Sequence, residues 1–264
     1  MPAEPGWVAL FCLQLGLGAH LLLTCVPLDS LGAGFLRFMC LVDGVATGLG
    51  WWLLPQRRAG ALGLAALAAL VLILLDAAGS GWRGYRAARR ARVPLLAAGL
   101  ATLVLGALRV AGAARLDGAA SAALVSAHLA AALLLGCVVL DLILGHWYLV
   151  VPELSIEPFR RITRLLLGAL LLRAALVAAT IMLFGRGLGR GYDSLDFWVQ
   201  SGIFWVMAAG CGLLVPLALS GFLLKTVELR STQAATGIVY VVVFFVLMGE
   251  LTFRHLAAAT GLPL

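Results

Sequence analysis

Long runs of apolar residues, separated by short polar breaks, make up almost the whole sequence. A helix of about 20 apolar residues can cross the hydrocarbon core of a bilayer. The breaks contain Pro and Gly residues, which end helices for steric reasons. The pattern therefore predicts eight membrane-spanning helices, at about residues 7–27, 35–54, 60–78, 94–114, 120–150, 159–184, 196–224 and 232–258.

The composition supports this pattern and limits the fold class. The chain of 264 residues is 63% hydrophobic and only 12% charged, whereas a soluble domain carries about 25% charged residues. No loop exceeds about 15 residues, which leaves no room for a folded domain outside the membrane. We therefore expect a single all-α transmembrane domain over residues 1–264, in contact with membrane lipid. The net charge of +7 does not indicate a nucleic-acid partner, because the basic residues lie in short clusters between apolar blocks.

Eight spans place both termini on one side of the membrane, here called side A, and the opposite side is side B. The side-B loops hold more Arg and Lys than the side-A loops, mainly through the cluster from Arg83 to Arg92. Because basic loops stay in the cytoplasm, this bias predicts a cytoplasmic side B and periplasmic termini. The predicted location is the bacterial inner membrane.

Four histidines lie in predicted spans, and two of them share one helix. His128 and His146 are 18 residues apart, which is five helical turns and about 27 Å, so both side chains leave the same face. This helix could offer an axial ligand to a haem near each surface, with His20 completing the pair with His146 and His255 the pair with His128. Bis-histidine ligation suits electron transfer, because both axial positions of the iron are filled. The spacing predicts two haem b groups, or one.

This spacing and topology resemble the di-haem b-type cytochrome subunits of respiratory complexes, for example the gamma subunit of membrane-bound nitrate reductase. There too, one helix carries two haem-ligating histidines at long spacing. The chain departs from that pattern in having eight spans rather than five. The resemblance implies an electron-transfer subunit of an oxidoreductase complex, with other redox subunits as partners. The alternative is that the histidines are packing or interfacial residues and that no haem binds.

Charged residues inside spans form a second set of candidates: Asp43, Asp76, Asp141, Arg173, Glu250 and Arg254, with Arg109 near the end of the fourth span. Such groups are costly in hydrocarbon and indicate a functional or a paired structural role. We expect Glu250 to pair with Arg254 at i, i+4, and Arg173 to pair with Asp141 on the preceding helix. The carboxylates could instead relay protons.

Aromatic and polar residues gather near side B, at the end of the fifth predicted span and in the loop after it. A quinone needs an apolar slot, hydrogen bonds to both ring oxygens and a proton acceptor. The candidates for such a site are Trp147, Tyr148, Glu153, Glu157 and Gln233.

All five cysteines lie in predicted spans, without a CxxC motif, so neither a structural zinc site nor an external disulfide framework is expected. Three functions remain open. The first is a cytochrome b-like subunit that carries electrons between a quinone pool and a partner redox subunit. The second is a haem-free subunit that binds quinol, relays protons or is purely structural. The third is a small-solute transporter, against which the sequence shows no convincing inverted repeat.

Overall fold

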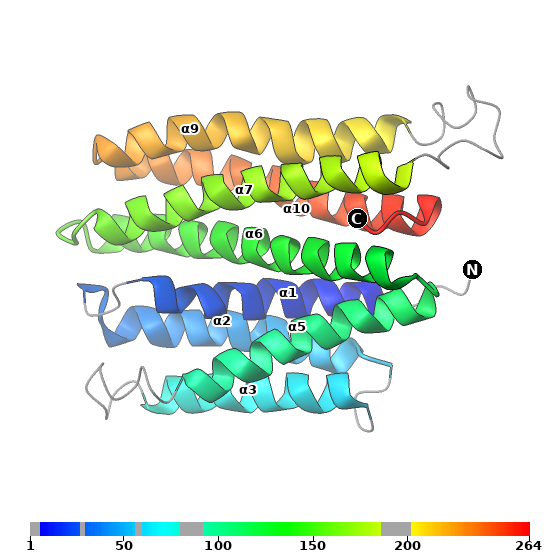
Figure 1. The fold of residues 1–264 in the computed structure, drawn as a ribbon. Coiled ribbons are helices and arrows are strands. Elements are labelled where there is room, and N and C mark those ends of the chain that lie inside the picture. The colour runs from blue at the N-terminus through cyan, green and yellow to red at the C-terminus, as the bar shows by residue number, and fades with distance from the viewer. Residues whose placement is uncertain (1–5, 27–29, 56–59, 80–91, 186–201) are drawn as a thin grey trace.

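The computed structural model describes residues 6–26, 30–55, 60–79, 92–185 and 202–264, and in these residues it contains helices and no strands (Figure 1). The helices are α1 (Gly6–Leu22), which a 3-10 turn (Leu23–Cys25) extends, α2 (Gly32–Leu53), α3 (Ala61–Gly79), α5 (Val93–Ala113), α6 (Gly118–Val150), α7 (Glu157–Phe184), the π-helical segment η4 (Val206–Leu214), α9 (Val215–Glu228) and α10 (Thr232–Thr260).

In the part of the chain that the structure describes, these segments make up eight helices that are long and apolar enough to cross a membrane, with α1 continuing into its 3-10 turn and η4 into α9. The predicted all-α membrane bundle is therefore confirmed. The seventh span covers Gly202–Glu228, so its predicted start at residue 196 lies outside the described residues. The start of α1 and the end of α10 lie at the same end of the bundle, as an even number of spans requires (Figure 1).

The helices form two groups of four with the same order of neighbours. In the first group α1 packs on α2, α2 on α3, α3 on α5 and α5 back on α1. In the second, α6 packs on α7, α7 on α9, and α10 on both α9 and α6. Contacts of α6 with α1 and α5 join the groups (Figure 1).

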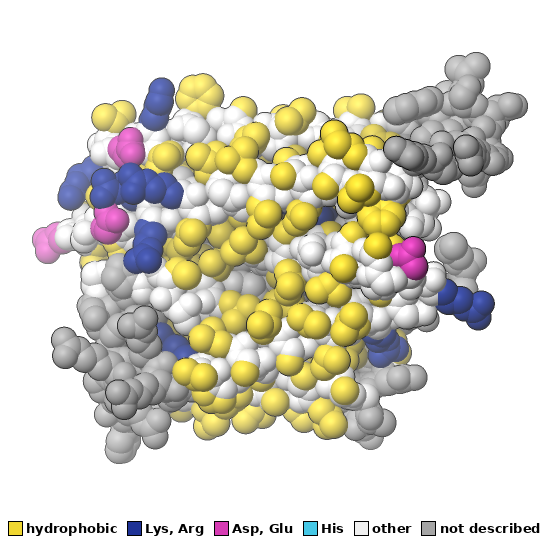
Figure 2. All heavy atoms as spheres, in the orientation of Figure 1, with side chains coloured by type: hydrophobic (Ala, Val, Ile, Leu, Met, Phe, Trp, Pro, Cys, Tyr) yellow, Lys and Arg dark blue, Asp and Glu magenta, His cyan; other side chains and the backbone are white. Residues whose placement is uncertain are grey.

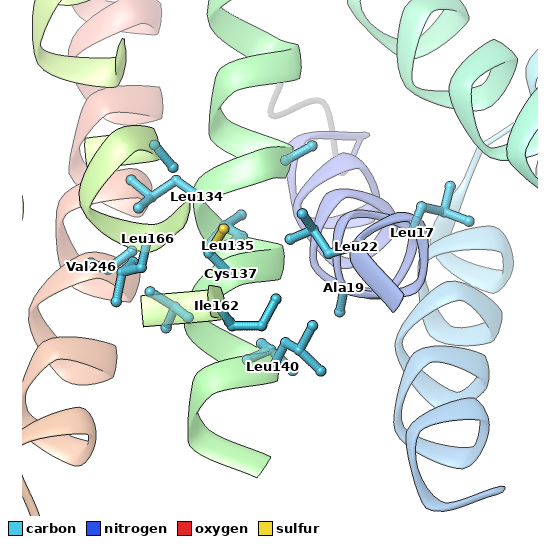
Figure 3. Packing of buried hydrophobic residues seen from close by; sticks show 14 of the residues in the cluster. Leu17, Ala19, Leu22, Leu134, Leu135, Cys137, Leu140, Ile162, Leu166 and Val246 are labelled. Carbon is cyan, nitrogen blue, oxygen red and sulfur yellow. The ribbon is translucent and has the colours of Figure 1, made fainter. Parts of the chain in front are cut away.

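Helices α1 and α6 form the centre of the molecule. Within the most apolar stretch of each span, 67% of the residues are buried in α6 and 61% in α1, against 39% or less in every other span. Figure 3 shows the reason for α6, whose residues Leu134, Leu135, Cys137 and Leu140 lie between α1 on one side and α7 and α10 on the other. The outer helices leave apolar side chains exposed, as lipid contact requires.

Two glycines allow α1 and α6 to touch through their backbones. A Cβ added to Gly18 would lie 2.0 Å from the carbonyl oxygen of Ala132, and one added to Gly136 would lie 2.3 Å from the carbonyl carbon of Gly18. Small residues permit this approach in membranes. Because α1 and α6 are the first and fifth spans, they run in the same direction, and this contact fixes their relative depth.

The π-helical segment η4 precedes Pro216 in the seventh span. A proline has no N–H, and its ring clashes with the carbonyl four residues earlier in an α-helix. The wider π turns relieve that clash without breaking the span.

The exposed charges lie at the ends of the bundle. Where α6 meets α7 and α9 meets α10, Figure 2 shows basic and acidic side chains together, and the visible surface between the two ends is largely apolar. Arg164 and Glu228 form an ion pair of 3.6 Å at this end. An apolar band between charged ends is the surface of an integral membrane protein.

Candidate functional site

A buried group of ionisable side chains lies inside the first four helices. Nδ1 of His20 on α1 lies 3.0 Å from Oδ2 of Asp43 on α2, and Nε2 lies 3.8 Å from Oδ2 of Asp76 on α3. Arg92, the residue before α5, donates from Nε to the same Asp76 oxygen at 2.9 Å. His20, Asp43 and Arg92 are almost completely buried. Four helices thus contribute to one cluster, which we call the His20 cluster.

Helix register explains why these residues meet. His20 lies in the last turn of α1, Asp76 in the last turn of α3 and Arg92 directly before α5, so all three are at the side-B end. Asp43 reaches His20 because α1 and α2 approach closely. A Cβ added to Gly16 would lie 2.6 Å from the carbonyl oxygen of Asp43.

Nε2 of His20 and Oδ1 of Asp43 are buried and lack a hydrogen-bond partner among the described residues. An unpaired polar atom is costly in an apolar interior, and an ionisable residue inside a membrane indicates function. The charges are also incompletely balanced. Arg92 compensates one carboxylate, and a proton on His20 would compensate the other.

A second polar group lies nearer side A, between α1, α6 and α10. Gln14 donates from Nε2 to the backbone carbonyl of His128 at 2.8 Å. Its Oε1 accepts a hydrogen bond from Arg254, whose guanidinium carbon lies 5.2 Å from the centre of the Phe11 ring. This group joins the two halves of the molecule near side A.

The expected Arg173–Asp141 pair is wrong. Arg173 instead binds Glu250 of α10 through two hydrogen bonds, of 2.8 and 3.1 Å. The depth of the side chains in the membrane explains why Arg173 pairs with Glu250 and not with Asp141. Arg173 follows the start of α7 by 16 residues, and Glu250 follows the start of α10 by 18, which places both about 24–27 Å from side B. Asp141 is only nine residues, about 14 Å, from the side-B end of α6.

The other intramembrane charges also have partners that differ from those expected. Asp141 accepts a hydrogen bond of 3.1 Å from Thr163 of α7. Glu250 uses both oxygens on Arg173, and Arg254 bonds to Gln14 instead of to Glu250.

The structure does not bring His20 and His146 to one depth. Along the parallel helices α1 and α6, His20 follows the Gly18 contact by two residues, and His146 follows Gly136 by ten. At 1.5 Å per residue the two lie about 12 Å apart along the axis. The His146 side chain is exposed on α6, whereas that of His20 is buried against carboxylates.

His128 and His255 lie at similar depth but face different neighbours. Measured from the contact of Gly145 with Thr236, they are 17 and 19 residues toward side A, about 26 and 28 Å. His128 is buried, and its Nε2 lies 3.6 Å from where a Cβ on Gly106 of α5 would be. His255 is exposed, and its ring centre lies 4.4 Å from that of Phe204.

The described side chains therefore do not form the two facing histidine pairs that bis-histidine haem requires. Haem ligation by these four residues stays a prediction from the sequence.

The quinone candidates do not share one slot. Trp147 packs edge-on against Phe35 of α2, with ring centres 5.6 Å apart. Tyr148 is buried, stacks on Phe159 of α7 at 5.5 Å, and donates a hydrogen bond to the Ser155 carbonyl. The polar candidates Glu153, Glu157 and Gln233 are exposed, and Glu157 forms an ion pair with Arg160. Quinone binding stays a prediction.

Sequence reasoning missed Cys40 and did not connect Asp76 or Arg92 with His20. The sulfur of Cys40, Nε2 of His20 and an Asp76 oxygen lie within 4.8 Å of one another. One sequence feature could have pointed to Cys40, which lies three residues before Asp43 on the same helix face. No spacing motif links Cys40 with His20 and Asp76, because the three residues lie on three separate helices.

Comparison with known proteins adds no assignment. The chain matches no protein-family model, no curated protein and no solved structure at a significant level.

Proposed function

We propose that this integral membrane protein relays protons within the bilayer, as a haem-free subunit or partner of a membrane energy-converting complex. The proposed location is the bacterial inner membrane, with side B in the cytoplasm because its loops carry more basic residues. With no loop long enough to fold as a soluble domain, the driving force would come from a partner subunit.

One observation carries the proposal, namely the carboxylate that faces each ring nitrogen of the buried His20. Asp43 lies 3.0 Å from Nδ1 and Asp76 lies 3.8 Å from Nε2. An imidazole can accept a proton on one nitrogen and release one from the other. Chains of Asp, Glu and His are the usual proton relays of membrane proteins.

The positions of the polar groups give the relay a direction. Asp76 and Arg92 lie at the side-B end, and His20 passes the proton inward to Asp43. The hydroxyl of Thr47, one turn further along α2 toward side A, is buried without a partner among the described residues. Gln14 and Arg254 lie about 9 Å from His20 along α1, toward side A. Bound water would connect these groups.

The test is proton flux into vesicles that contain the purified protein. A potassium diffusion potential drives protons into the vesicles, and a pH-sensitive dye trapped inside them reports the resulting change in pH. We expect flux above that of empty vesicles, reduced to the empty-vesicle level by His20→Ala and by Asp43→Asn. His146→Gln is the matched control, because its side chain is exposed and outside the cluster. Wild-type flux equal to that of empty vesicles, or unaltered by both cluster variants, would refute the proposal.

The electron-carrying cytochrome b subunit with quinone is the competing hypothesis. Proton relay is preferred because the His20 cluster is present as a set of contacts, whereas the predicted haem ligands do not face each other in pairs.

A further inference from the structure

We propose that the His20 cluster also binds a divalent transition-metal ion of the zinc type, through Nε2 of His20, Sγ of Cys40 and a carboxylate oxygen of Asp76. These three atoms lie within 4.8 Å of one another. His20 and Cys40 are buried, and Asp76 is largely so. They come from three helices, α1, α2 and α3, that the first half of the fold brings together.

The distances suit a metal ion. Zinc binds nitrogen and oxygen at about 2.0–2.2 Å and sulfur at about 2.3 Å, so tetrahedral ligand atoms lie about 3.3–3.7 Å apart. Nε2 of His20 and Oδ2 of Asp76 are 3.8 Å apart. A small inward movement of the side chains would complete the coordination.

The ligand types select the class of metal. One nitrogen, one sulfur and one oxygen suit zinc, cobalt or copper. Calcium and magnesium prefer sites made of oxygen atoms alone. Three protein ligands leave a fourth position for water or a small ligand, as in zinc sites that are not purely structural.

The surroundings of the ligands support binding independently of their spacing. Asp43 lies 3.0 Å from Nδ1 of His20, and a carboxylate at this nitrogen typically orients a metal-binding histidine. The other nitrogen, Nε2, belongs to a residue that is only 3% exposed and has no hydrogen-bond partner among the described residues. Arg92 donates to Asp76 at 2.9 Å and would hold that carboxylate in place.

The metal-loaded cluster would carry no net charge. A divalent ion and Arg92 contribute three positive charges, which Asp43, Asp76 and the Cys40 thiolate balance. Cys40 must lose its thiol proton to bind, and any proton on Nε2 of His20 must leave as well, so metal binding releases at least one proton. Neutrality favours the loaded state in an apolar interior.

Metal and proton compete for the same nitrogen of His20. Metal binding itself depends only on the ligand geometry, whereas an effect on proton movement also rests on the proposed function. If both proposals hold, zinc inhibits the flux of wild-type vesicles, because an occupied Nε2 cannot accept a proton.

The test uses the full-length, metal-free protein in detergent, with Co²⁺ as a spectroscopic probe. We expect one Co²⁺ per chain, a thiolate-to-cobalt charge-transfer band, and displacement of the band by Zn²⁺. Cys40→Ser should abolish the band, and Cys211→Ser should keep it, because Cys211 lies outside the cluster. Asp43→Asn should weaken affinity by about 10–100-fold, as for other groups that orient metal ligands.

X-ray absorption of the zinc-loaded wild type provides a measurement that needs no variant. A spectrum in which zinc has one sulfur ligand together with nitrogen and oxygen ligands supports the site. Absence of stoichiometric binding, or a cobalt band that Cys40→Ser leaves unchanged, overturns it. The outcomes separate the two proposals, since intact flux without cobalt binding refutes only the metal site. Cobalt binding without flux refutes only the relay.

Discussion

At the scale of single residues, the ion pair of Arg173 with Glu250 shows how this protein accommodates charge in its interior. The residues are 77 positions apart, both are almost fully buried, and two parallel hydrogen bonds join them. The guanidinium carbon also lies 5.0 Å from the centre of the Phe253 ring. Such a fork geometry favours arginine over lysine.

Removing one partner of this pair should be strongly destabilising. Glu250→Gln leaves the Arg173 charge buried without its counterion, which typically costs about 3–5 kcal/mol. The change is measured as the free energy of unfolding in a mixed-micelle denaturation series. The double variant Arg173→Met, Glu250→Leu serves as the control and should recover most of the loss. A Glu250→Gln protein as stable as wild type would contradict a structural role for the pair.

The sequence predicts which charges are buried but not how they pair. Asp141 and Arg173 lie in spans, as hydropathy indicates, but pairing also requires equal depth and matching helix rotation. Depth depends on where each helix starts, and an error of two residues moves a side chain about 3 Å along the axis and rotates it to the opposite face. The expected Arg173–Asp141 pair failed because the two side chains lie about 10 Å apart in depth, although the predicted ends of both helices were close to the observed ones.

At the scale of helices, close packing depends on small residues at a few contacts. The contact of Gly18 with Gly136 joins the two halves of the molecule, and that of Gly212 with Gly249 joins the seventh span to α10. In the second contact an added Cβ would lie 2.4 Å from the opposite Cα. Without such glycines these helix pairs would have to separate.

A matched pair of alanine substitutions tests the first contact. Gly136→Ala places a methyl group against the α1 backbone and should lower the free energy of unfolding by about 1–3 kcal/mol. Gly168→Ala is the control, because nothing lies within 4 Å of the added atom. The readout is the unfolding midpoint in detergent. Equal midpoints for both variants would show that the two helices separate at no cost.

Hydropathy predicts where the helices lie in the sequence far better than it predicts which helices contact each other. All eight predicted spans have a counterpart, and where both ends are described they agree within a few residues. The grouping into two sets of four was not predicted, because apolar side chains can face lipid or protein equally well. The histidine pairs failed to face each other for the same reason, since His146 and His255 are on exposed surfaces.

At the scale of the whole molecule, the proposed orientation in the membrane rests on the basic loops of side B. The native cysteines all lie in spans, so new surface cysteines report sidedness. We expect Glu153→Cys, in the α6–α7 connection, to react with an impermeant thiol reagent only from the cytoplasmic side. Ala114→Cys, in the α5–α6 connection, should react only from outside. The reverse labelling of both would invert the proposed topology.

The absence of facing histidine pairs leads to a prediction about the spectrum. We expect protein purified from haem-replete cells to show no b-type bands in a reduced-minus-oxidised spectrum, because bis-histidine haem needs two imidazoles on one iron. Replacement of all four histidines, at His20, His128, His146 and His255, provides the baseline. Stoichiometric b-type bands that disappear in this variant would restore the cytochrome hypothesis.

The pairing of buried charges also sets an order for membrane insertion. The first two spans carry His20 with Asp43, and the next two are flanked by Asp76 with Arg92, so each helical hairpin enters the bilayer with its charge already partly compensated. The second half differs. Arg173 enters with α7, but its counterion arrives only with α10, two spans later. Until then α7 is a poorly tolerated span, and truncation of the chain before residue 250 would leave Arg173 inside the membrane without its counterion.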